Sequence, residues 1–279
     1  MKLSSNSLYI VSTPIGNLDD ITFRAVEVLK NSDIILCEDT RHSLKLLNHL
    51  NIKKKLISYH KFNEKKKSFS IIEYIKQGKI LSLISDAGTP LLSDPGRLLL
   101  NQCIENNIAV VPIPGVSSIT TAMSISGFKD QFLFYGFLPK TENELEKILS
   151  SLSQNTFTLI FFIPSLKINF YLKKFMKYFA GRKLLIAKEL TKMHEVLLRE
   201  NIDNIKLFKT KLKGELTVVI SEEINKNRIL NIEKIVNKAQ KYLKKYSLRD
   251  TVDLISISEK INKKEIYKIC LKVKNEKNF

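Results

Sequence analysis

The sequence predicts an α/β protein with two α/β domains and a C-terminal helical tail. In the first half of the chain, short apolar runs alternate with amphipathic stretches, an order typical of a parallel sheet covered on both faces. From about Gly115 several apolar runs follow one another, which favours a mixed sheet. After about Asn225 only helical patterns remain. We therefore expect a first domain at 1–115, a second at 116–225 and a basic helical tail at 226–279.

In the first domain, each expected strand is a short apolar run, and each expected helix spaces its apolar residues along one face. Asp19 or Asp20 is expected to cap the first helix, and Gly78 to end the third. The expected strands cover residues 8–13, 33–39, 55–59, 79–85 and 108–114. The expected helices cover residues 21–30, 42–50, 70–78 and 96–107.

The second domain is expected to begin with a helix of small residues at 117–126, which lets a backbone or ligand approach closely. Helices are expected between the strands that follow. These strands cover residues 131–139, 157–164, 182–190, 195–201 and 214–222.

The tail is expected to form helices at 232–246, 248–258 and 263–273. Their apolar faces include Ile235, Ala239, Tyr242 and Leu243, and suitable N-caps for the last two helices are Ser247 and Asn262.

The net charge of +18 permits an RNA partner without establishing one. Only seven of the 46 basic residues are Arg, so AT-rich coding explains the lysines as well as an RNA-binding surface does. The tail is strongly basic, since residues 224–279 hold 15 Lys and Arg against six Asp and Glu. The tail is therefore expected to be either an RNA-docking module or a solvated helical cap.

Other features narrow the class of protein. No apolar run approaches the roughly 20 residues that a membrane span requires, and the first residues have too short an apolar stretch for a signal peptide. The three cysteines lie far apart, without the spacing of a metal site or a disulfide framework. We expect a cytoplasmic protein with no metal and no membrane contact.

Three loops rich in Gly, Pro and Ser follow expected strands, at residues 12–17, 85–90 and 112–118. Because parallel strands end at one edge of their sheet, these loops should meet there, where open α/β sheets bind ligands. Glycine allows a backbone to approach a ligand, and proline fixes the direction of approach. Three ordinary turns are the alternative for each loop taken alone. The usual dinucleotide and P-loop phosphate motifs are absent from the sequence.

The segments TPIGNLDDIT (13–22), EDTR (38–41), SDAGTPLLSDPG (85–96) and PIPGVSS (112–118) resemble, in order and spacing, the tetrapyrrole methylase superfamily of S-adenosylmethionine-dependent methyltransferases. Within it, they are most similar to enzymes that methylate a ribose 2′-hydroxyl of small-subunit ribosomal RNA. AKELTKMHE (187–195) and KGELTVVI (213–220) extend the resemblance over nearly the whole chain. The resemblance implies two domains of tetrapyrrole-methylase type with a cofactor cleft between them. It also implies a homodimer and, as substrate, a cytidine ribose of 16S rRNA in the small ribosomal subunit.

The resemblance also implies which residues bind S-adenosylmethionine. It assigns contacts with the donor to polar side chains of the second loop, whose small residues allow the backbone to approach the donor closely. One proline and a pair of serines line the other sides of the donor. The implied cofactor-binding residues are Pro14, Ser85, Asp86, Ala87, Gly88, Thr89, Ser117 and Ser118. Asp86 could instead be a helix or turn cap.

The segment EDTR supplies the candidates for catalysis. Methylating a hydroxyl requires alignment and removal of a proton, and Glu38 and Asp39 follow a strand at the same edge as the loops. Adjacent strand residues point to opposite faces, so we expect one of them to face the cleft. Arg41 could hold a phosphate of the target or pair with a carboxylate, and a structural ion pair is the alternative role of this segment. Asn17, Lys192 and Glu195 are weaker candidates, and His194 is expected to be a surface residue.

One segment departs from the family's pattern. Residues 161–167 read FFIPSLK, with Phe162 and Ile163 where the family usually has Tyr-Glu, and Leu166 and Lys167 where it has His-Arg. We interpret the segment as an altered wall of the cleft. Two further functions stay open: methylation of a tetrapyrrole or of a protein side chain on the same fold, and a non-catalytic role in RNA binding or ribosome assembly.

Overall fold

The first part of the chain folds into a five-stranded parallel sheet of order β3-β2-β4-β1-β5. These observations come from a computed structural model that describes residues 3–223, 226–259, 261 and 263–277. The strands are β1 (Ser7–Val11), β2 (Ile34–Cys37), β3 (Lys55–Ser58), β4 (Ile80–Leu83) and β5 (Ala109–Ile113). The prediction of a parallel sheet is confirmed.

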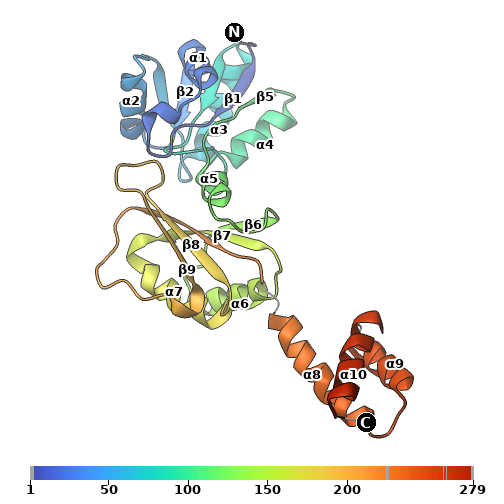
Figure 1. Ribbon diagram of the computed structural model, residues 1–279. Coiled ribbons are helices and arrows are strands. Elements are labelled where there is room, and N and C mark those ends of the chain that lie inside the picture. The colour runs from blue at the N-terminus through green and yellow to red at the C-terminus, as the bar shows by residue number, and fades with distance from the viewer. Residues whose placement is uncertain (1–2, 224–225, 260, 262, 278–279) are drawn as a thin grey trace. The chain divides into compact units, whose positions relative to one another are not determined.

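Helices cover both faces of this sheet (Figure 1). α1 (Phe23–Asn31) and α2 (Thr40–His49) pack on one face, where Leu29 and Leu47 meet Val11 and Ile35 of the strands. α3 (Glu64–Lys76) and α4 (Arg97–Glu105) pack on the other face through residues that include Ile71 and Leu99. Alternate residues of β1 and β2 therefore pack into the two different cores, which explains why these strands are mainly apolar.

The starts of α1 and α3 differ from the sequence prediction. The cap of α1 is Thr22, whose hydroxyl accepts a hydrogen bond from the Ala25 amide at 3.1 Å. Asp19 and Asp20 instead belong to a short 3₁₀ turn capped by Asn17. α3 begins at Glu64 rather than Ser70, although it ends before Gly78 as expected.

The next part of the chain forms a mixed sheet of order β6-β7-β10-β8-β9, in which only β6 and β7 run parallel. The strands are β6 (Phe132–Phe137), β7 (Thr158–Pro164), β8 (Lys183–Lys188), β9 (Val196–Asn201) and β10 (Glu215–Ile220). α6 (Glu142–Ser153) and α7 (Ile168–Tyr178) cover one face. α5 (Ser118–Ser124) packs on the other face, together with Ile15 from the loop after β1.

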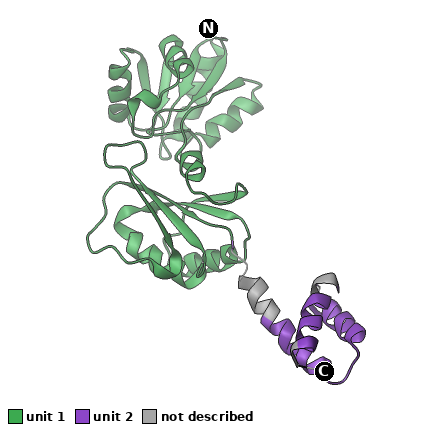
Figure 2. Cartoon of the chain, viewed as in Figure 1, with its two compact units in different colours: residues 1–222 green, residues 223–279 purple. Residues whose placement is uncertain are grey.

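The chain divides into two compact units, residues 1–222 and 223–279 (Figure 2). The first unit holds both sheets. The second contains α8 (Lys226–Tyr242), α9 (Leu248–Glu259) and α10 (Lys263–Lys277). Further division of the first unit at residue 115 stays a prediction.

The second unit has its own apolar core, which includes Ile235 and Ala239, with Tyr242 and Leu243 packed against it, as the sequence predicts. Ser247 caps α9 through a 3.2 Å hydrogen bond from the Asp250 amide, whereas Asn262 lies outside the described residues. Among the helices that are described, none is both long and apolar enough to cross a membrane.

Candidate functional site

The three Gly- and Pro-rich loops meet at the carboxyl ends of β1, β4 and β5. Thr13 and Gly88 exchange two backbone hydrogen bonds of 2.9 and 3.0 Å. The Ser12 and Thr89 hydroxyls lie 3.0 Å apart, and Thr89 donates to the Val116 carbonyl at 3.2 Å. The loops therefore brace one another, as predicted from their positions after parallel strands.

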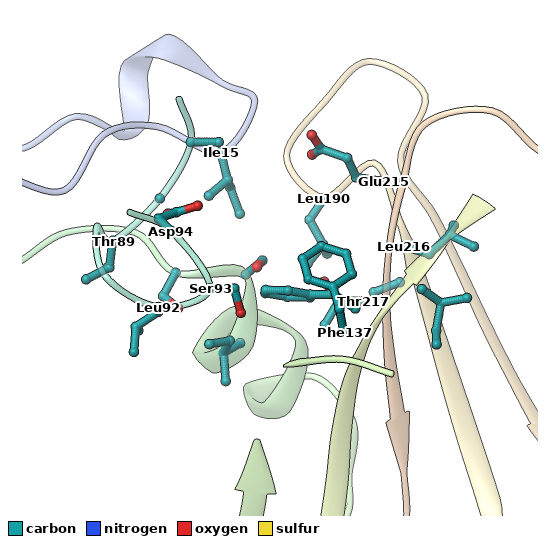
Figure 3. Close-up of a pocket in the computed structure, with 18 of the residues that line it drawn as sticks. Ile15, Thr89, Leu92, Ser93, Asp94, Phe137, Leu190, Glu215, Leu216 and Thr217 are labelled. Atoms are coloured by element: carbon teal, nitrogen blue, oxygen red, sulfur yellow. The ribbon is translucent and has the colours of Figure 1, made fainter. Parts of the chain in front are cut away.

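A cavity of about 360 Å³ opens beside these loops, with residues of the first sheet's loops on one side and of the second sheet on the other (Figure 3). Six of the expected cofactor-binding residues line it, namely Asp86, Ala87, Gly88, Thr89, Ser117 and Ser118. Pro14 and Ser85 do not line it. Pro14 is buried, and the Ser85 hydroxyl donates to the carbonyls of Ala87 and Gly88, each at 3.2 Å. Ser85 thus stabilises the conformation of the loop without lining the cavity.

The opposite wall of the cavity is largely apolar. Phe162 and Ile163 line it, and the Phe162 ring packs against Phe137, with 5.4 Å between ring centroids. The interpretation of the altered segment as a wall of the cleft is confirmed for these two residues. Leu166 does not line the cavity and is 71% exposed, and Lys167 is also exposed. The wall therefore supplies an apolar surface opposite the polar loops.

Gly16 fits the loop after β1 tightly against the segment after β8. A Cβ on this residue would lie 2.9 Å from the backbone oxygen of Leu190 and 2.8 Å from the Thr191 hydroxyl oxygen. The Asn17 amide donates to the same hydroxyl at 3.0 Å. A residue without a side chain is therefore required at position 16, where the loop after β1 meets the segment after β8.

The loop after β4 carries two acidic residues that line the cavity, and sequence reasoning missed one of them, Asp94. Asp94 lines the cavity, and burial together with the charge of Glu38 raises its pKa to about 6. Burial likewise raises the pKa of Glu38, and the charge of Asp86 adds to that increase. Glu38 and Asp86 both act on Asp94, and the carboxyl groups of Asp86 and Asp94, which line the cavity, suit a cationic ligand. The signals for Asp94 were its place in the segment SDAGTPLLSDPG and the repetition of a Ser-Asp pair at 85–86 and 93–94.

Left-handed backbone brings Asp94 to the cavity. Leu91 and Ser93 both have φ of 73°, a conformation rare for residues with a side chain. Leu92 and Ser93 line the cavity as well. Such strain persists only where the surroundings hold it, and it often marks functional loops.

The structure separates the roles of the residues in EDTR. Asp39 caps α2 by accepting a 2.8 Å hydrogen bond from the Arg41 amide, and its carboxylate also pairs with the Arg41 guanidinium at 2.8 Å. These hydrogen bonds hold the pKa of Asp39 well below its usual range. The Asp39 amide in turn donates to Asp86 at 3.2 Å. Glu38 is half-buried, and its charge raises the pKa of the cavity residue Asp94. Glu38, Asp39 and Arg41 do not themselves line the cavity.

The weaker candidates have structural partners or face solvent. Lys192 pairs with Glu189 and Glu215, each at 3.0 Å. Glu195 accepts a hydrogen bond from the Thr191 amide, and His194 is exposed as expected. Within the described ranges, no cluster of three or more His, Cys, Asp or Glu residues is arranged to hold a metal ion.

Comparisons with known proteins place these features in a family. The family model for tetrapyrrole (corrin/porphyrin) methylases matches residues 7–206. The chain is 42% identical over 275 residues to the ribosomal RNA small subunit methyltransferase I of Rickettsia prowazekii, a match that covers 96% of this chain and 98% of that protein. The protein of the same name from Thermotoga maritima is 41% identical over 217 residues, or 77% of this chain and 97% of the relative.

A solved structure is similar in fold. The uroporphyrin-III C-methyltransferase of Thermus thermophilus, complexed with S-adenyl homocysteine, has a TM-score of 0.56 and 15% identity. The alignment covers 77% of this chain and 97% of that chain.

Proposed function

Because the chain belongs to the tetrapyrrole methylase family, we propose that it methylates the 2′-hydroxyl of a cytidine ribose in small-subunit ribosomal RNA, with S-adenosylmethionine as methyl donor. The identity to enzymes named for small-subunit ribosomal RNA supports this substrate over a tetrapyrrole. We also propose that the substrate is 16S rRNA within the small subunit, and that the enzyme acts as a cytoplasmic homodimer.

The observation that carries the proposal is the chemistry of the cavity. Asp86 and Asp94 place negative charge on one side, and Phe162 and Ile163 form an apolar wall on the other. A sulfonium cation that carries a flat adenine and a polar ribose requires this combination. Gly88 has φ of 78°, and a Cβ there would lie 3.2 Å from Ile15 Cγ2. The loop side of the cavity therefore needs a residue without a side chain at this position. The residues present therefore fit the donor.

We assign the donor site to the loops after β1, β4 and β5, with Asp86, Gly88 and Thr89 as contacts and Ser117 and Ser118 at the far side. Pro14 and Ser85 support these loops rather than touch the donor. When bound, S-adenosylmethionine supplies an electrophilic methyl group. The protein's contribution is to align the ribose hydroxyl and to remove its proton.

Among the EDTR residues, we assign proton removal to Glu38, because its raised pKa makes it a better base than a carboxylate held by an arginine. Asp39 orients the start of α2 and holds Arg41, whose side chain is 87% exposed. That exposure leaves the guanidinium accessible to a phosphate of the RNA while it pairs with Asp39.

The proposal is tested by mapping ribose methylation in small-subunit RNA from cells with and without the gene. We expect one cytidine ribose to lose its methyl group when the gene is absent. A radiolabelled transfer assay should offer protein-free RNA, small subunits and a porphyrinoid in parallel. Transfer to the porphyrinoid alone, or to none while the donor does not bind, would favour the other two functions.

Asp94 predicts a pH dependence of donor binding. Below pH 6 the carboxyl group is largely protonated, and this uncharged form favours the folded state. As the pH rises through about 6, ionisation places another negative charge beside Glu38 and Asp86, which lowers stability but attracts a cation. Affinity for S-adenosylmethionine, measured by calorimetry, is therefore expected to increase between pH 5 and 7. Asp94→Asn should flatten the increase, and an unchanged profile in this variant would refute the assignment.

The second unit predicts a salt-dependent contribution to RNA binding. Lys241, Lys244, Lys245 and Arg249 are exposed around the turn from α8 to α9. A chain that ends at Glu222 should keep its donor affinity but bind small subunits more weakly, with a smaller slope of log affinity against log salt. Replacing Lys244, Lys245 and Arg249 by Gln should reproduce the smaller slope. Lys263→Gln is the control, since Lys263 pairs with Asp253 at 2.8 Å.

Unchanged affinity and slope in the shortened chain would instead identify the unit as a solvated cap.

A further inference from the structure

A turn that sequence reasoning did not single out follows β3 at the same edge of the sheet as EDTR. The Tyr59 amide donates to the Cys37 carbonyl at 2.7 Å, and the Ser58 hydroxyl donates to the Glu38 carbonyl at 3.4 Å. The turn, residues 59–63, is thus joined to the backbone that carries Glu38. His60 lowers the pKa of Glu38, against the larger effect of burial, and Glu38 in turn raises the pKa of the cavity residue Asp94.

Asn63 holds this turn in one conformation. Its side-chain oxygen accepts from the His60 amide at 2.9 Å, and its amide group donates to the Ser58 carbonyl at 3.2 Å. Lys67 donates to the same carbonyl at 2.7 Å. The amides of Asn63 and Glu64 both donate to the His60 carbonyl, at 2.9 and 3.0 Å. The backbone around Phe62 is therefore well ordered without help from the Phe62 side chain.

Phe62 is 93% exposed at the tip of the turn. Its ring touches only the edge of His60, with 6.1 Å between centroids and a 65° angle between the planes. A single exposed apolar side chain is common and carries no argument alone. Here, however, the turn is tied down by polar contacts and the ring makes no contribution to either core of its sheet. Because the side chain is 93% exposed, the ring is available to a flat partner.

Exposed lysines lie close to Phe62 in the sequence. Lys61, Lys65 and Lys66 are exposed, and none of them forms an ion pair within the part of the chain that the structure describes. Arg41 lies in the first turn of α2, and its side chain is exposed while it pairs with Asp39. An aromatic platform bordered by lysines is how proteins bind unpaired nucleotides, with bases stacked on the ring and phosphates near the cations.

We propose that Phe62 stacks on an unpaired base of the RNA substrate close to the methylated ribose, and that Lys61, Lys65 and Lys66 contact the adjoining phosphates. This inference rests on the proposed function, and it adds a positioning residue for the substrate. Stacking outside the cavity fixes the strand so that a nearby ribose can enter beside Glu38. Phe62 itself takes no part in proton removal.

The test compares Phe62→Ala, Phe62→Tyr and Phe69→Ala in binding to unmethylated small subunits and in methyl transfer. Phe69 is the matched control, because it is 74% exposed on α3 but lies outside the turn. Phe62→Ala is expected to raise the KM for subunits by about tenfold or more, with little change in kcat or in donor affinity. Phe62→Tyr should restore binding, and Phe69→Ala should resemble the wild type.

Salt dependence separates the ring from the lysines. Phe62→Ala should weaken binding equally at all salt concentrations, because stacking releases no counterions. Replacing Lys65 and Lys66 by Gln should instead reduce the salt slope. Equal effects of Phe62→Ala and Phe69→Ala, or failure of Phe62→Tyr to rescue, would overturn the proposal.

Two further outcomes distinguish this inference from the proposed function. If wild-type protein transfers no methyl group to small subunits, the proposed function fails, whereas the binding comparison still reports on Phe62. If Phe62→Ala weakens binding to intact subunits but not to protein-free ribosomal RNA, the ring contacts a protein, and stacking on a base is wrong.

Discussion

Replacing Glu38 by glutamine is expected to slow methyl transfer by about 100-fold or more, while donor affinity stays close to that of the wild type. The substitution preserves size and hydrogen bonding but removes the only EDTR carboxyl group whose pKa is raised. Because Glu38 does not line the cavity, its loss should leave the donor site intact. Single-turnover transfer to small subunits, with calorimetry for the donor, measures both effects.

Asp39→Asn and Arg41→Ala are the companions to this variant. Asp39→Asn should chiefly loosen the start of α2, because the side chain caps that helix and pairs with Arg41. Arg41→Ala should weaken RNA binding more than it slows methyl transfer to bound RNA. If all three variants retain full transfer, the proton is removed elsewhere in the cleft.

The first sheet was predictable because its central strands β2, β4 and β1 are largely buried. β2 is buried at every position, so the sequence shows an unbroken apolar run there. The meeting of the three loops followed from the same reasoning, since parallel strands must end together. By contrast, the cap of α1 was misplaced, because Asn17, Asp19 and Thr22 are all suitable caps and local sequence does not decide among them.

The acidic side of the cavity could be predicted only in part. Asp86 lies just after the end of β4, whereas Asp94 returns to the cavity through left-handed backbone at Leu91 and Ser93. No local rule predicts that conformation for leucine or serine. The same limit applied to EDTR, where the sequence allowed either a phosphate contact or an ion pair for Arg41. The structure shows the ion pair with Asp39, and the exposure of Arg41 leaves the phosphate contact compatible with it.

Gly88→Val is expected to lower donor affinity at least tenfold. Valine is strained at φ of 78°, a conformation that costs L-residues about 1–2 kcal/mol. Its Cβ would also lie 3.2 Å from Ile15 Cγ2 and 3.7 Å from the Val116 oxygen, so its methyl groups must displace these neighbours or enter the cavity. Either result disturbs the wall that Ile15 and Gly88 form together. Calorimetry with S-adenosylmethionine measures the change, and thermal unfolding records the accompanying loss of stability.

Gly127→Val separates strain from the effect on the cavity. Gly127 has φ of 72°, close to that of Gly88, but a Cβ there would meet nothing within 4 Å. Both valine variants should therefore be destabilised by a similar backbone term, whereas only Gly88→Val should bind the donor weakly. Gly88→Ala should fall between them, because it adds the strained Cβ without the outer methyl groups. Wild-type donor affinity in Gly88→Val would exclude this loop as the donor site, since backbone approach at Gly88 is the contact on which that assignment depends.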